Sequence, residues 1–214
     1  MLHPKAWLDS IRIRDAVANY PIYAPPHKLD YKSITALQSR ENYSYFDDQR
    51  AIRLAHFSQW IDNFGISATI DNAGIQSISG WIHRYAGHLL TADIYSSRHL
   101  YSSFTPVWSG SHRGLNVIWD LGIYAGDWIV QQNPACSWAL NTGDEDPVSR
   151  NMTGFRRPCI LIQKRPGVFP VFNFLFDVAV AKRDLVTIGA IRIGDPNTPC
   201  NGFELQLRDR AARS

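Results

Sequence analysis

The sequence predicts an α+β fold, in which an N-terminal helical hairpin and a central buried helix pack on a mostly antiparallel C-terminal sheet. Apolar residues recur at helical spacing over 42–64 and 71–89, and the segment 114–132 is apolar around most of a helix circumference. Strand-like runs bounded by Gly, Pro or Asn follow later in the chain, at 158–163, 186–193 and 202–208. Helices that precede strands without strict alternation favour an α+β fold over a parallel doubly wound sheet.

The helical segments at the start of the chain are bounded by turn and capping residues. A weak helical pattern over 7–19 ends before three prolines, and a short helix is expected at 34–38. We expect the longer helix of the hairpin to begin at a cap on Asn42 or Ser44, and its partner at a cap on Asp71. Charged residues are expected on the faces of the longer helix away from its apolar stripe, at Asp47, Asp48, Arg53 and Asp62.

The middle and the end of the chain are less regular. Many serines and threonines over 91–114 predict a long loop or a ragged strand. Alternation over 136–140 predicts a strand, and the acidic segment 142–154 predicts an exposed connection. A further helix is expected to begin near Pro170, because proline is well tolerated in a first helical turn.

Two glycines stand inside the central helix, at Gly122 and Gly126, where each costs roughly 1 kcal/mol relative to alanine. They lie one turn apart on the apolar side of the helix. The polar residues form one narrow stripe that consists of Arg113, Asn116, Asp120, Tyr124, Asp127 and Gln131. A helix with so narrow a polar stripe must be covered on most sides. We therefore expect the glycines to form a flat groove that lets another helix or the sheet approach closely.

Composition and charge exclude several classes of protein. We predict that the 214 residues form a single domain over 1–214, with a soft boundary near residue 110. The formal net charge is +3 and neither half of the sequence has a strong basic excess, so nucleic-acid binding is not expected. Three cysteines without a CxxC pair argue against a disulfide framework and a zinc knuckle. The absence of a secretory signal and of a long apolar run predicts a cytoplasmic protein with no membrane partner.

A motif in the central helix resembles that of a group of known proteins. The stretch LGIYAGDWIVQQNPACSW at 121–138 is similar to the pattern Leu-Gly-x-Tyr-x-Gly-acidic followed by Trp on a strand, which is seen in small, largely uncharacterised bacterial α/β proteins. The matching residues are Leu121, Gly122, Tyr124, Gly126, Asp127 and Trp138, with Asp127 where glutamate is commoner. Some of these proteins are regarded as immunity or accessory proteins of secreted toxins. The resemblance implies an immunity-like role and no known catalytic residue.

An enzymatic alternative centres on the loop 108–115. His112 would act as a base and Arg113 as an anion clamp in a small hydrolase or transferase, with Asp127, Asp120 or another carboxylate within reach of His112. Asp120 and Asp127 are themselves two helical turns apart, roughly 10 Å, which is too far for one metal ion or a shared proton. The sequence has neither a nucleophile elbow nor a P-loop, so we expect no cofactor and no metal.

The leading hypothesis is a non-enzymatic protein-interaction module, most concretely an immunity or antitoxin-like protein that binds and neutralises a cognate toxin. It rests on the absence of a complete catalytic set, the seven tryptophans, the long polar loop and the resemblance above. The residues that we expect to bind the protein partner are Tyr101, Trp108, Arg113, Asp120, Tyr124 and Asp127.

Overall fold

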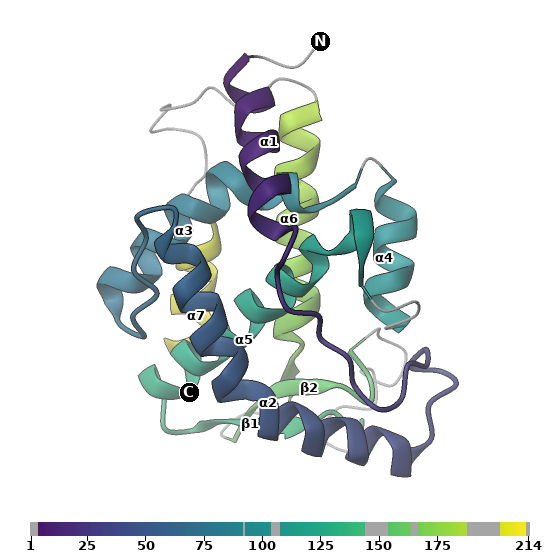
Figure 1. The fold of residues 1–214 in the computed structure, drawn as a ribbon. Helices are drawn as coiled ribbons and strands as arrows, with labels where there is room; N and C mark the ends of the chain where they lie inside the picture. Colours follow the sequence, from purple (N-terminus) through teal and green to yellow (C-terminus); the bar gives the residue numbers. More distant parts are fainter. Residues whose placement is uncertain are drawn as a thin grey trace.

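A computed structural model describes residues 4–91, 93–103, 108–143, 154–163, 167–187 and 202–212. This part of the chain has an α+β fold, with seven α-helices and a small three-stranded antiparallel sheet packed against them (Figure 1). The predicted fold class is therefore confirmed. Within the described residues, no helix is long and apolar enough to cross a membrane.

The predicted N-terminal helices form, with one boundary shifted. α1 (Pro4–Val17) is followed by the long α2 (Ala36–Asp62) and by α3 (Asn72–Tyr85), which continues as the 3-10 turn η1 (Ala86–Leu89). Asp71 caps α3 as predicted, because its side chain accepts a hydrogen bond from the Gly74 amide at 2.7 Å. The predicted cap of α2 at Asn42 or Ser44 is wrong. The helix begins earlier, at a capping box formed by Thr35 and Gln38, so the short helix expected at 34–38 is the first turn of α2.

Helix α4 (Ile94–Ser103) occupies part of the region that was predicted to be a long loop or a ragged strand. Asp93 holds its first turn by accepting a hydrogen bond from the Ser96 amide at 3.0 Å. At the other end, the Arg157 guanidinium donates to the carbonyls of Tyr101, at 3.0 Å, and Ser102. A cation at the C-terminal carbonyls stabilises a helix, and this one lies more than 50 residues away in sequence. The local sequence therefore could not reveal it.

The central helix and the first two predicted strands are confirmed, whereas the third strand of the sheet was not predicted. After the 3-10 turn η2 (Gly110–His112) comes α5 (Gly114–Gln132), and the sheet has the order β1 (Cys136–Leu140), β2 (Pro158–Ile162) and β3 (Val168–Phe169). β1 and β2 are antiparallel, with Trp138 opposite Ile160. α6 (Val171–Thr187) begins directly after Pro170 as expected. The first two residues of the strand predicted at 186–193 belong to α6, and the rest of that run lies outside the described residues. Most of the connection predicted at 142–154 also lies outside the described residues.

The last predicted strand, at 202–208, is instead part of α7 (Gly202–Ala212). Phe203 and Leu207 are buried four residues apart, whereas Leu205 between them is 64% exposed. Apolar residues at i and i+4 lie on one face of a helix. The alternation of Phe203, Leu205 and Leu207 favoured a strand, but only Phe203 and Leu207 are buried.

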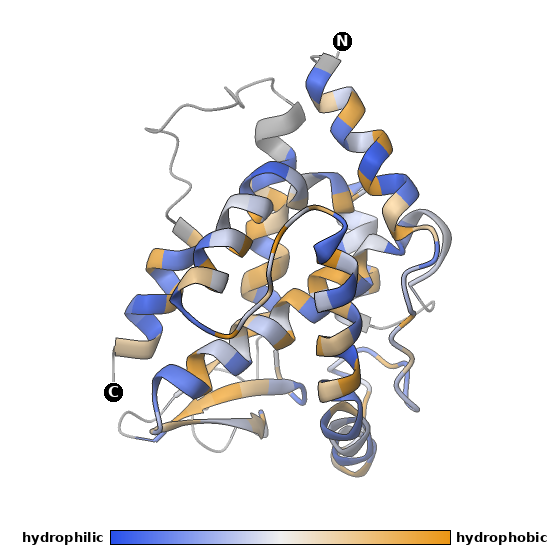
Figure 2. Cartoon of the chain, turned by 60° about the vertical axis from the view of Figure 1, so that its left-hand side comes forward, coloured by the Kyte–Doolittle hydropathy of each residue, from blue (hydrophilic) through white to orange (hydrophobic). Residues whose placement is uncertain are grey.

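α5 lies in the middle of the molecule, and its two glycines allow both neighbours to approach (Figure 1). A Cβ atom at Gly122 would lie 2.4 Å from the Phe172 ring on α6, and one at Gly126 would lie 2.1 Å from the Trp138 ring on β1. The Trp119 ring stacks on Phe172 with centroids 3.7 Å apart. The expected groove is confirmed, and it accepts a helix at one glycine and the sheet at the other. Figure 2 shows that α1, by contrast, mixes hydrophilic and hydrophobic residues along its length.

Candidate functional site

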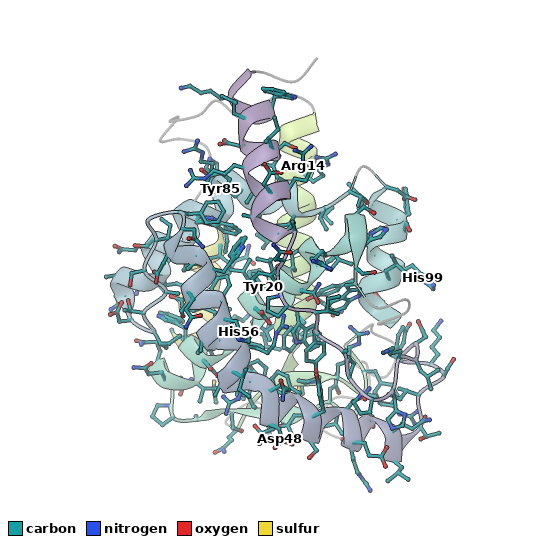
Figure 3. The ribbon with its side chains drawn as sticks, in the orientation of Figure 1. Arg14, Tyr20, Asp48, His56, Tyr85 and His99 are labelled. Atoms are coloured by element: carbon teal, nitrogen blue, oxygen red, sulfur yellow. The ribbon has the colours of Figure 1, made fainter. Side chains whose placement is uncertain are left out.

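The polar stripe of α5 meets two side chains from the N-terminal part of the chain. Asp120 accepts hydrogen bonds from the Tyr20 hydroxyl at 2.6 Å and from Arg53 Nε at 2.8 Å, and Arg53 Nη2 lies 2.8 Å from its second oxygen. Arg53 also donates to the Pro21 carbonyl at 2.8 Å. Tyr20 lies near the middle of the molecule (Figure 3). All three side chains are buried, so this is a closed charged cluster within the core.

Burial governs the electrostatics of this cluster. It raises the pKa of Asp120 to about 6, although the Arg53 charge and the hydrogen bonds from Arg53 and Tyr20 lower it. Burial also raises the pKa of Tyr20 well above its ordinary value, and the neighbouring Asp120 charge adds to this. The phenol therefore stays protonated and donates to the carboxylate. The arrangement supports a structural role, because the opposite charges of Asp120 and Arg53 are paired with each other and Tyr20 donates its hydrogen bond within the cluster.

Arg53 was predicted to lie away from the apolar stripe of α2, and this is wrong. It is buried on the same face as Phe46 and Phe57, from which it is separated by seven and four residues. That spacing was visible in the sequence. An arginine inside an apolar helical stripe indicates a buried anion opposite it, and Asp120 is that anion.

Asp127 joins three elements rather than facing solvent. It accepts hydrogen bonds from Arg50 Nη1 on α2 at 2.6 Å and from Trp138 Nε1 on β1 at 2.8 Å. Its side chain is 19% exposed. The Trp138 ring that fills the space beside Gly126 is thus also fixed by the residue that follows that glycine.

The other residues that were predicted to bind a partner also lie inside the molecule. The Tyr124 hydroxyl donates to the Thr69 carbonyl at 2.9 Å, and the Tyr101 hydroxyl donates to the Phe172 carbonyl at 3.1 Å. The rings of Tyr101 and Trp108 stack with centroids 5.1 Å apart. Tyr101, Trp108, Asp120 and Tyr124 are buried, and Arg113 and Asp127 are half-buried. These six residues therefore do not form a surface in this structure.

His112 and Arg113 lie on η2 and at its junction with α5. His112 is half-buried and its Nδ1 has no hydrogen-bond partner among the described residues. Arg113 donates to the Ala18 carbonyl at the end of α1. Asp120 and Asp127, the carboxylates that were expected near His112, are bound to Arg53 and Arg50 instead. The structure therefore commits these two carboxylates to arginines and not to His112. No group of three described His, Cys, Asp or Glu side chains is placed to hold a metal ion.

The outward side of α2 carries a set of exposed residues that the sequence analysis did not single out. We call it the α2 face, and it consists of Leu37, Glu41, Asp48, Ile52 and Ala55. These positions fall within about 60° on a helical wheel. Leu37 is 64% exposed and Ile52 is 49% exposed. Figure 3 shows Asp48 on the lower part of α2.

Comparison with family models, with curated proteins and with solved structures finds no match to this chain.

The candidate functional surface must therefore be identified from the geometry of the molecule alone. The charged and aromatic residues that come together around α5 are bound to one another in the core, and Gly122 and Gly126 are explained by packing. The α2 face is a surface that combines apolar and acidic side chains.

Proposed function

We propose that this protein is a non-enzymatic bacterial interaction module of the immunity type, which binds a toxin and keeps it inactive. The observation that carries the proposal is the α2 face, which is the outward side of a 27-residue helix. Such a helix is roughly 40 Å long and can present a continuous surface to a protein partner. Leu37 and Ile52 supply the apolar contacts, and the carboxylates supply the polar ones.

Two of the three arginines of α2 turn away from the α2 face. Arg50 and Arg53 point to Asp127 and Asp120, which neutralise their positive charges, whereas Arg40 is exposed on an adjacent side of the helix. Asp48 and Glu41 remain exposed on the outward side, where Glu41 contacts His27. A protein with a net charge of +3 thus has a locally acidic helix face. This face suits a partner with a basic binding surface.

Co-expression tests the proposal. The product of the adjacent gene is produced with and without this protein, and both complex formation and cell growth are measured. We expect a stable complex and restored growth. The absence of both complex and rescue would refute the immunity function.

Matched variants test the surface. Ile52→Lys and Asp48→Lys should each weaken the complex about tenfold or more, because each places a positive charge against the basic surface of the partner. Leu205→Lys on α7 is the control, since Leu205 is equally apolar and 64% exposed but lies outside the α2 face. An intact complex in all three variants would place the binding surface elsewhere.

A further inference from the structure

A cavity of about 430 Å³ lies where three distant segments of the chain meet. The end of α1 contributes Val17, η1 contributes Leu89, and the turn that leads into α5 contributes Ser111 and Gly114. The Gly114 backbone touches η1 so closely that a Cβ atom there would lie 2.2 Å from the Leu89 carbonyl oxygen. The volume falls in the range of sites for small organic molecules.

The charged side chains that line this cavity are basic. Arg14 and Arg113 line it, and none of its described lining residues is acidic. Arg14 forms an exposed ion pair at 3.1 Å with Asp15, which is not among the lining residues. Such surface pairs contribute little free energy, so Arg14 can exchange Asp15 for another anion. His88 also lines the cavity, and burial lowers its pKa.

Arg113 has hydrogen-bonding capacity to spare. One terminal nitrogen donates to the Ala18 carbonyl, while its Nε is buried without a partner among the described residues. The Val17 carbonyl also accepts a hydrogen bond, from the Tyr20 amide at 3.0 Å. The Val17 and Ala18 carbonyls at the end of α1 therefore already accept hydrogen bonds, which reduces the repulsion between their partial negative charges and a bound anion. The positive end of the α5 dipole lies at Gly114 and adds to the two guanidinium charges.

We propose that this cavity binds a small phosphate monoester, with Arg113 and Arg14 on the phosphate group and Leu89, Leu90 and Val17 against the organic part. A phosphate monoester carries close to two negative charges at neutral pH, which matches two guanidinium groups better than a single carboxylate does. The planar guanidinium also fits phosphate oxygens in pairs. The apolar lining residues and the volume leave room for more than an inorganic ion. This site is independent of the α2 face.

Calorimetric titration of the full chain with three probes tests the proposal. Phenyl phosphate should bind more tightly than inorganic phosphate, because its ring contacts the apolar wall. Benzoate, which has the same ring and one negative charge, should bind more weakly than phenyl phosphate. Equal binding of benzoate, or no binding of phenyl phosphate at millimolar concentration, would overturn the proposal.

Variants locate the binding. Arg14→Gln and Arg113→Gln should each weaken phenyl phosphate binding about tenfold or more, as expected for the loss of a charged hydrogen-bond partner. Arg98→Gln is the control, because Arg98 is an exposed arginine on α4 that pairs with Asp177 and does not line the cavity. The Arg14 side chain is 73% exposed, so Arg14→Gln keeps the test valid even if Arg113→Gln fails to fold. Equal affinity of Arg14→Gln and Arg98→Gln would show that binding is not in this cavity.

Discussion

The clearest prediction concerns Gly126→Ala in the middle of α5. A Cβ atom at this position would lie 2.1 Å from Cζ2 and 2.4 Å from Cη2 of Trp138, far inside normal carbon–carbon contact. The indole ring cannot simply swing away. Its Nε1 donates to Asp127, and the ring packs against Phe46 with centroids 5.0 Å apart and against Phe172.

The magnitude follows from three contributions. Overpacking of a buried contact costs about 1–3 kcal/mol, and loss of the hydrogen bond from Trp138 to the Asp127 carboxylate costs about 1.5 kcal/mol. Alanine is favoured over glycine in a helix by about 1 kcal/mol, which opposes both. The free energy of unfolding should therefore fall by about 1.5–3.5 kcal/mol. For a protein of this size, that corresponds to a decrease in Tm of roughly 3–14 °C.

Gly80→Ala is the matched control. Gly80 also lies inside a helix, α3, but a Cβ atom there meets nothing within 4 Å. This variant should gain up to about 1 kcal/mol from helix propensity alone. Urea unfolding followed by tryptophan fluorescence measures both variants. If Gly126→Ala were as stable as Gly80→Ala, the close packing of Trp138 on α5 would be refuted.

Three further predictions concern the ion pairs of α5. Because burial raises the pKa of Asp120 to about 6, the folded state binds the Asp120 proton more tightly than the unfolded chain does. The stability that this proton adds is therefore greatest below about pH 4 and is lost as the pH rises to about 6. Urea unfolding of Asp120→Asn should lack this pH dependence. Arg53→Met should lower the free energy of unfolding by about 3–5 kcal/mol at neutral pH, and by less at pH 4, where Asp120 is protonated; an equal loss at both pH values would contradict an ionised pair. A double-mutant cycle of Arg50→Gln and Asp127→Asn should give a coupling of about 1 kcal/mol, since this pair is only half-buried; additive effects would show that the two side chains do not interact.

Those parts of the fold that are encoded locally could be predicted from the sequence. The apolar circumference of α5, its two glycines and the proline that follows it specify a buried helix with a definite end. Asp71 and Pro170 likewise mark where α3 and α6 begin. Each of these signals lies within a few residues of the structure that it predicts.

Several failures share a physical origin, which is stabilisation by distant residues; the capping box at Thr35 and the place of Arg53 on the apolar face of α2 were visible locally. α4 is held at its C-terminal end by Arg157, and α7 is a helix because Phe203 and Leu207 are buried together. The polar stripe of α5 was located correctly, but its burial depends on Tyr20 and Arg53, which are 100 and 67 residues away. The sequence does not show that these groups meet, so residues in the core were taken for a partner-binding surface.

The position of α5 in the chain has a consequence for synthesis. Tyr20 and Arg53, which cover one side of this helix, precede it in sequence, whereas Trp138 and Phe172, which cover the other side, follow it. A ribosome that has just released α5 has not yet produced the segments that shield its second side. The nascent chain therefore exposes the apolar surface of α5 until α6 emerges, and during that interval this surface can be bound by chaperones.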